Sequence, residues 1–108
     1  MVKTWVAGLA LAMIASARAD DLAATRKAEL VRLVRQDCGS CHGMTLRGGL
    51  GPPLTTAALA DKPESMIAAT IMHGRPGTAM PPWRPFLTEA EADWVASRLK
   101  RGFGDDAR

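Results

Sequence analysis

The sequence has only two cysteines, and both fall within one short motif, Cys38-Gly39-Ser40-Cys41-His42. Two thiols separated by two residues can add to the two vinyl groups of one haem. A histidine directly after the second thiol is then held against the iron, where its imidazole becomes an axial ligand. The motif therefore predicts one covalently bound haem c, attached through Cys38 and Cys41 and ligated by His42.

Three other uses of this motif have to be weighed. A disulfide between Cys38 and Cys41 would suit an oxidising compartment, although so small a ring stabilises little. A thioredoxin-like redox pair requires a βαβ context, and no stretch alternates convincingly enough to be a strand. A zinc site requires four ligands, and His73 is the only other strong one in the sequence. Haem attachment fits the motif best.

The second axial ligand has to come from elsewhere in the chain. The candidates are Met44, Met66, Met72, Met80 and His73. Met80 lies in a proline-stiffened segment that can hold a thioether at one point, and a soft thioether suits haem iron. Met66 and Met72 stand among aliphatic residues and favour core packing, while Met44 is too near His42 to reach the opposite haem face. We therefore expect Met80 as the metal ligand, with His73 as the alternative; an exposed loop methionine would leave the iron five-coordinate.

The elements that must position these residues are all helical in our reading. A stripe of Leu30, Leu33 and Val34 with charged residues opposite predicts a helix over 20–36. Asp61 as cap and Pro63 in the first turn predict a second helix over 61–73. The capping box Thr88-Glu89-Ala90-Glu91 begins a third helix, and Gly102 ends it. Segments 43–54 and 75–87 are rich in glycine and proline and are expected to be long loops that wrap the haem.

The first 19 residues have the pattern of a cleaved secretory signal. Lys3 precedes an uncharged apolar run, and Ala17-Arg18-Ala19 places small residues where a signal peptidase reads. A membrane anchor is the rival interpretation, but the run is short for a bilayer, which needs about 20 apolar residues. We expect residues 20–108 to form one monohaem domain in the periplasm, a monomer with no membrane span after cleavage.

Charge excludes one class of partner. The formal net charge of the whole chain is +3, and Lys3 and Arg18 would leave with the signal. The remaining basic residues are scattered, which is no nucleic-acid footprint. The expected domain is also small for a hydrophobic core of its own, and a large apolar cofactor would supplement it.

The motif, Gly51-Pro52 after it and Gly77-Thr78-Ala79-Met80-Pro81-Pro82 near the end together resemble class I cytochrome c. The resemblance implies a small cytochrome c fold of three helices around one haem. It also implies that the carbonyl of Pro52 fixes the ring of His42 through its other nitrogen. The first and last helices would cross, so that the stripe on helix 20–36 meets Trp94, Val95 and Leu99.

Two longer runs, 37–54 and 73–86, resemble the small monohaem cytochromes encoded beside the haem c/haem d nitrite reductase of denitrifying bacteria. This resemblance implies an electron carrier, not an enzyme, with redox proteins such as nitrite reductase as partners. The alternative is a factor in maturation or loading of the reductase's specialised haem. Arg47, Arg75 and Arg84 could pair with haem propionates or face an acidic partner. Trp83 is expected at the haem edge, its indole N–H near a propionate, because a buried indole needs an acceptor.

Overall fold

The computed structural model describes Gly8 and residues 22–103, and within these residues it contains helices and no strands. The helical elements are α1 (Ala24–Leu33), the π-helix η2 (Val34–Cys38), α2 (Gly39–His42), α3 (Thr56–Leu59), α4 (Glu64–His73) and α5 (Glu89–Arg101). This confirms the predicted all-α class. The predicted signal peptide, apart from Gly8, lies outside the described residues.

The first helical stretch differs from the predicted helix 20–36 at its end. The elements α1, η2 and α2 follow one another without a gap, so the chain stays helical through the cysteine motif to His42. Nothing before Gly43 breaks a helix, and Gly43 is the first residue with a positive φ, +92°. In η2 the N–H of Gly39 bonds to the carbonyl of Val34, a five-residue spacing that widens the helix by one residue. The predicted start at Asp20 lies outside the described residues. Within the described residues the helix begins at Ala24.

The middle of the chain contains a short helix that the sequence did not predict. Thr55 caps α3 by accepting a hydrogen bond from the N–H of Ala58 at 3.2 Å. The predicted role of Asp61 as the cap of the next helix was wrong. Pro63 occupies that position with an extended ψ of 145°, and its carbonyl accepts the N–H groups of Met66 and Ile67. Helix α4 ends at His73, as expected from the glycine that follows.

Both ends of α5 agree with the sequence. The Thr88 hydroxyl accepts the N–H of Glu91 at 3.2 Å, and the Glu91 carboxylate accepts the N–H of Thr88 at 2.9 Å. This reciprocal pair satisfies two backbone donors that the first helical turn leaves free. Gly102 ends the helix in the left-handed region at φ +108°, which a glycine adopts without a Cβ penalty.

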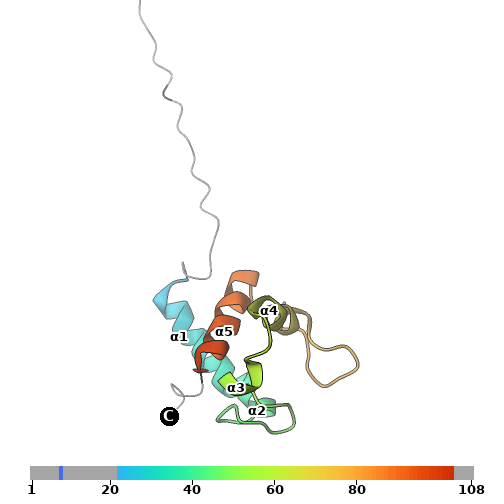
Figure 1. Cartoon of the computed structure of the whole chain (residues 1–108). Coiled ribbons are helices and arrows are strands. Elements are labelled where there is room, and N and C mark those ends of the chain that lie inside the picture. Colours follow the sequence, from blue (N-terminus) through green and yellow to red (C-terminus); the bar gives the residue numbers. More distant parts are fainter. Residues whose placement is uncertain (1–7, 9–21, 104–108) are drawn as a thin grey trace, which may run out of the picture.

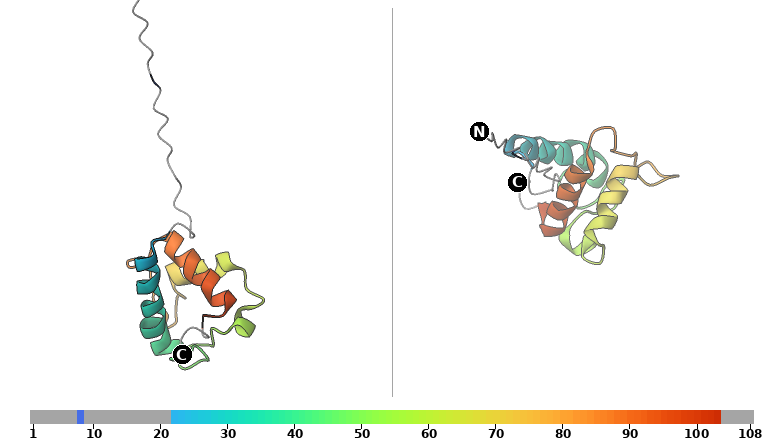
Figure 2. Two further views of the ribbon diagram at one scale, coloured as in Figure 1. Left: turned by 90° about the vertical axis from the view of Figure 1, so that its left-hand side faces the viewer. Right: turned by 90° about the horizontal axis from the view of Figure 1, so that it is seen from above.

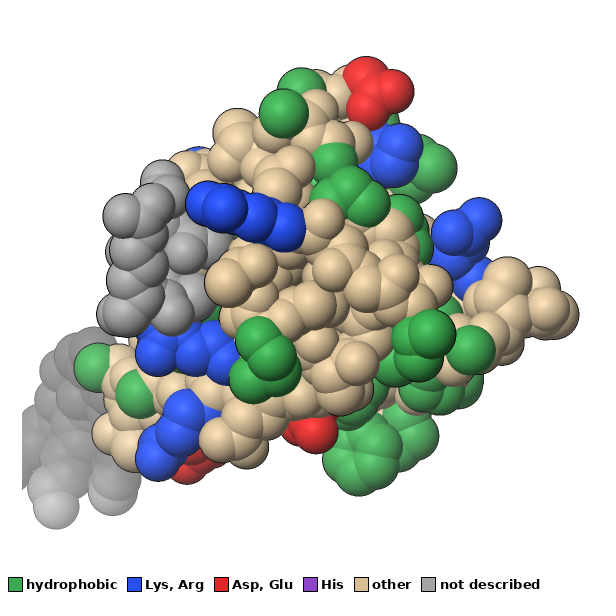
Figure 3. All heavy atoms as spheres, turned by 90° about the horizontal axis from the view of Figure 1, so that it is seen from below, with side chains coloured by type: hydrophobic (Ala, Val, Ile, Leu, Met, Phe, Trp, Pro, Cys, Tyr) green, Lys and Arg blue, Asp and Glu red, His purple; other side chains and the backbone are tan. Residues whose placement is uncertain are grey.

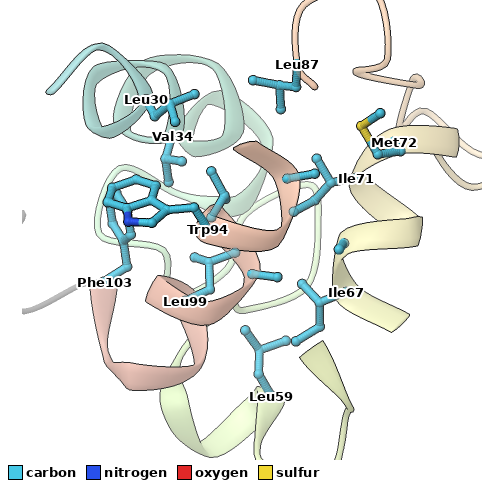
Figure 4. Packing of buried hydrophobic residues seen from close by; sticks show 14 of the residues in the cluster. Leu30, Val34, Leu59, Ile67, Ile71, Met72, Leu87, Trp94, Leu99 and Phe103 are labelled. Atoms are coloured by element: carbon cyan, nitrogen blue, oxygen red, sulfur yellow. The ribbon is translucent and has the colours of Figure 1, made fainter. Parts of the chain in front are cut away.

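Helix α5 lies between α1 and α4, as Figures 1 and 2 show. In the core, Trp94 and Leu99 of α5 face Leu30 and Val34 on one side and α4 on the other (Figure 4). These residues are buried, as expected from the helix stripe, whereas Leu33 is only partly buried against the cluster. Leu30, Val34, Trp94, Val95 and Leu99 therefore belong to one buried cluster, which agrees with the prediction that the first and last helices share a core.

The two methionines of α4 have different environments. Met72 is buried in the core, as predicted, but the side chain of Met66 is 54% exposed, and its expected core role was wrong. Both belong to one ten-residue helix that is apolar around much of its circumference. Such a helix shows no clear polar face in the sequence, so periodicity alone could not separate the two positions.

A buried carboxylate joins α1 to α5. Glu91 is 7% exposed, and its carboxylate accepts a hydrogen bond from Nε of Arg26. Arg26 also pairs with Glu29 at 2.9 Å and donates to the carbonyl of Phe86 at 3.2 Å. The Arg26 guanidinium lowers the pKa of Glu91 below its ordinary value, and the capping bonds of Thr88 act in the same direction. The network holds α1 against the start of α5.

None of the helices in the described part of the chain is long and apolar enough to span a membrane. On the face in Figure 3, lysine and arginine side chains stand apart from one another among hydrophobic and other side chains. This face therefore presents no continuous basic surface.

Candidate functional site

A cavity of about 740 Å³ brings the predicted site residues together. Cys38, Cys41, His42, Met80 and Trp83 all contribute to its lining. Much of the remaining wall is apolar and comes from α4 and α5, including Ile67, Ile71, Val95 and Leu99. The size and lining are those of a site for one large, mostly apolar group.

The ring of His42 is fixed from the loop that follows it. Its Nδ1 lies 2.7 Å from the carbonyl oxygen of Pro52, the contact that the family resemblance implies. Since a carbonyl only accepts, Nδ1 carries the proton and Nε2 remains the nitrogen available to a metal. Gly51 allows this close approach, because a Cβ at that position would lie 2.8 Å from His42 Nδ1.

The two cysteines at the cavity are free thiols in this structure. Cys41 is exposed and Cys38 is half-buried. Burial, with the neighbouring Asp37 carboxylate, raises the pKa of the Cys38 thiol to about 11. A thiol with so high a pKa stays protonated at neutral pH, unlike the thiolate of a reactive redox pair.

The loop that carries Met80 folds back on the end of α4. The Thr78 hydroxyl donates to the carbonyl of Arg75 at 2.6 Å and accepts the N–H of Met80 at 3.3 Å. Gly74 has a φ of +68°, and a Cβ there would lie 2.7 Å from the carbonyl oxygen of Met80. A glycine at the helix end is therefore what lets the Met80–Pro82 backbone pack directly against it.

The other candidates for the second iron ligand differ in whether they line the cavity. Among the alternatives to Met80, only Met66 lines the cavity. His73 is exposed and outside the lining, as is Met44, while Met72 is buried in the core. Met80 and Met66 are thus the thioethers in a position to face a bound group. The sequence analysis named Met66 as a candidate but assigned it to the core, because its helix has no polar face to mark the position as exposed.

Only one of the three arginines named in the sequence analysis lines the cavity. Arg75 lines it, whereas Arg47 and Arg84 do not. Lys62 and Asp37 also contribute to the lining, and neither was expected there. Lys62 follows the unpredicted helix α3, and its carbonyl accepts a hydrogen bond from Lys100 Nζ at 2.5 Å. Because α3 was not predicted, no sequence pattern placed Lys62 at the cavity.

Trp83 lines the cavity and is half-buried, so it is not a fully exposed loop residue. Its backbone N–H donates to the carbonyl of Ile71 in α4 at 3.0 Å. The expected contact of the indole with a haem propionate stays a prediction.

The geometry weighs against the other uses of the motif. Cys38 and Cys41 form no disulfide. Residues 22–103 contain no strand, so the βαβ unit that a thioredoxin-like pair requires is missing from them. Nor do the described residues bring together three or more metal-ligating His, Cys, Asp or Glu side chains, as a zinc site would need. The site fits a haem c: two thiols and an oriented imidazole border one large apolar cavity.

An all-helical fold with one large apolar cavity, lined by the Cys38–His42 motif, defines a c-type cytochrome. Comparison with known proteins agrees. A family model described as cytochrome c oxidase, cbb3-type, subunit III, matches residues 25–97. Cytochrome c55X of Stutzerimonas stutzeri is 50% identical over 99 residues, which cover 89% of this chain and 88% of that protein. Cytochrome c55X of Paracoccus denitrificans is 57% identical over 76 residues, covering 70% and 74%.

A solved structure of a c-type cytochrome named NirC superposes with a TM-score of 0.73 at 50% identity, covering 74% of this chain and 94% of that one. The chain belongs to this family of c-type cytochromes and, within it, to the cytochrome c55X group. It is an electron-transfer protein with covalently bound haem c, not an enzyme. These relatives also support the association with nitrite reductase that the two longer runs predicted.

Proposed function

We propose that this cytochrome donates single electrons to a nitrite reductase in the periplasm during denitrification. Cys38 and Cys41 would hold the haem covalently, with His42 and Met80 as the axial ligands of its iron. The observation that carries the proposal is that one apolar cavity gathers all four residues. Two protein ligands leave the iron no position for a substrate, so the bound haem supplies one-electron oxidation and reduction.

The chain's own residues set the properties of that site. Hydrogen bonding of Nδ1 to Pro52 orients the His42 ring and makes it a better donor to a metal. A thioether from Met80 would favour the reduced state and raise the reduction potential. The apolar wall from α4 and α5 excludes water and acts in the same direction.

The location and assembly state belong to the same proposal. The apolar run and small-residue site at the N-terminus direct the chain through the inner membrane, with cleavage after Ala19. Residues 20–108 would then work in the periplasm as a monomer. An oxidising compartment is compatible with the two thiols because thioether bonds to the haem consume them.

A second candidate is a part in making or loading the specialised haem of the reductase. One observation favours it. The chain is 36% identical over 92 residues to a protein of Pseudomonas aeruginosa named dihydro-heme d1 dehydrogenase. That similarity covers 85% of this chain but only 18% of the dehydrogenase. It therefore concerns one segment of that protein, and electron donation remains the better supported proposal.

Deletion of the gene distinguishes the two candidates. An electron donor predicts nitrite reductase with its full complement of both haems and slow turnover in whole cells. A maturation factor predicts reductase that lacks its specialised haem. Complementation with the wild-type gene and with a Cys38→Ala variant is the matched control, because only the former should restore activity. Normal turnover with normal haem content would contradict both candidates.

A further inference from the structure

Phe86 is an exposed aromatic residue outside the cavity lining. Its side chain is 64% exposed. The next residue, Leu87, is 5% exposed and belongs to the core. The turn therefore buries one large apolar side chain and presents the other to solvent.

The backbone around Phe86 is held on several sides. The N–H groups of Phe86 and Leu87 both donate to the carbonyl of Trp83, at 2.9 and 3.1 Å. The carbonyl of Phe86 accepts a hydrogen bond from Arg26 of α1. The N–H of Arg84 donates to the carbonyl of Met72 at 3.3 Å. An aromatic ring on so well anchored a turn is pre-organised for contact, because little backbone entropy is lost on binding.

The exposed ring also touches a residue of the haem cavity. The ring centroids of Phe86 and Trp83 lie 5.8 Å apart with an interplanar angle of 55°, a favourable tilted geometry. Trp83 in turn lines the cavity. A pair of aromatic rings thus connects the cavity to the protein surface.

The charged residues that are bonded to Phe86 or close to it in the sequence do not favour a strongly charged partner. Arg26 is already paired with Glu29 and Glu91. Arg84 is exposed in the turn, and Glu89 is exposed at the start of α5. Arg84 precedes Phe86 by two residues and Glu89 follows it by three, so their opposite charges add little net charge to this part of the chain.

We propose that Phe86 is the centre of the docking surface for the redox partner, and that the Trp83–Phe86 pair is the contact through which the electron leaves. The partner would present an apolar patch beside its own cofactor. One electron passes from the reduced haem to the partner's oxidised cofactor, and no bond is made or broken. This inference rests on the proposed function, since it takes nitrite reductase as the partner.

The test compares three variants of the holoprotein, each first shown to keep the wild-type haem spectrum and reduction potential. Phe86→Ala removes the proposed centre. Met44→Ala is the matched control, because Met44 is 66% exposed and outside the cavity lining. Leu50→Ala probes the rival surface at the cavity itself, where Leu50 is 96% exposed. Reduced protein is mixed with oxidised nitrite reductase in a stopped-flow instrument, and the second-order rate constant is measured.

We expect Phe86→Ala to lower the rate constant about tenfold, the effect of removing an aromatic anchor from an interface, and Met44→Ala to leave it within about twofold. A second readout does not depend on turnover: the indole N–H resonance of Trp83 should shift when the reductase is added to wild type, and much less with Phe86→Ala. A loss of rate with Leu50→Ala and none with Phe86→Ala would overturn the docking proposal alone. A wild-type protein that does not reduce the reductase would overturn the proposed function and, with it, this choice of partner.

Discussion

The carbonyl oxygen of Pro52 and Nδ1 of His42 lie 2.7 Å apart, although the two residues are ten positions apart in the chain. The loop between them curls back on the end of the helix: the N–H of Gly48 donates to the carbonyl of His42, and that of Gly51 to the carbonyl of Cys41. The proximal side of the site is thus held by several backbone contacts of short sequence separation. The orientation of the His42 imidazole therefore does not depend on the more distant loop that carries Met80.

Gly51→Ala tests how tightly this side is packed. A Cβ at position 51 would lie 2.8 Å from Nδ1 and 2.9 Å from Cε1 of the His42 ring, so the ring or the loop has to move. We expect a shifted reduction potential and a loss of roughly 1–3 kcal/mol in the free energy of unfolding, typical of overpacking. Voltammetry and urea unfolding of the holoprotein measure both. Thr45→Ala, exposed in the same loop and outside the cavity, is the control and should change neither.

Met80→Ala should keep the haem but change the iron. The covalent attachment and His42 remain, while loss of the thioether admits water or a nitrogen ligand that favours the ferric state. We expect a high-spin or water-ligated spectrum at neutral pH, a lower reduction potential, and loss of the sulfur-to-iron charge-transfer band.

Two companion variants identify the ligand if Met80 is not the one. His73→Ala should be nearly silent at the iron, because His73 is exposed outside the cavity lining. Met66→Ala should also be nearly silent, although Met66 does line the cavity. A Met80→Ala protein with an unchanged low-spin spectrum, together with a Met66→Ala protein that loses it, would assign the bond to Met66.

Cys38→Ala or Cys41→Ala should sharply reduce the yield of holoprotein and destabilise the fold. The described core surrounds a cavity of about 740 Å³, which the haem has to fill for the helices to pack. Pyridine haemochrome spectra of purified protein measure covalent attachment. Ser40→Ala, between the two thiols, removes a hydroxyl that donates to the carbonyl of Asp37 and lies 3.9 Å from Cys41 Sγ, but it keeps both thiols and should retain full attachment. Acid-extractable haem in the wild type would contradict the assignment.

The Arg26–Glu91 pair should make stability depend on pH in acid. Because Arg26 lowers the pKa of Glu91 in the folded protein, the ion pair contributes its full stability above the ordinary pKa of 4.5. That contribution is lost as the pH falls through the lower, folded value. Glu91→Gln should cost about 1–3 kcal/mol near neutral pH and progressively less as the pH falls below 4.5.

Thermal unfolding of the two holoproteins, followed by circular dichroism across this range, measures the difference. Taking the difference removes acid effects that are common to both proteins. Glu89→Gln, an exposed carboxylate of the same first turn, is the control. A gap between wild type and Glu91→Gln that stays constant with pH would show that the charge of Glu91 does not stabilise the fold.

The sequence predicted the attachment motif, the helical class and the ends of α5 because each depends on local chemistry. The capping box of Thr88 and Glu91 needs only residues three positions apart. The predicted helix ended at residue 36, and its continuation to His42 was not predicted because a π-turn has no distinct residue signature. Helix α3 was missed because a four-residue helix has too little periodicity to detect.

The exposed positions of α4 and the cavity contacts of Lys62 and Arg75 required tertiary packing. Whether an apolar helix turns Met66 or Met72 toward the core is decided by α5, which packs against it. A sequence lists the thioethers, but only the arrangement of the helices separates those at the cavity from those in the core.

The residues on the attachment side of the cavity are close together in the sequence, whereas those on the opposite side come from a later part of the chain. Cys38, Cys41, His42 and Pro52 are contiguous enough to assemble through short-range contacts, whereas Met80 and Trp83 arrive from beyond α3 and α4. Closing a short loop costs less entropy than closing a long one, and it happens sooner. The attachment side can therefore form while the rest of the chain is still disordered. If Met80 is the second ligand, its bond to the iron would form last in assembly and break first, and a haem that had lost it would stay tethered to the chain through Cys38 and Cys41.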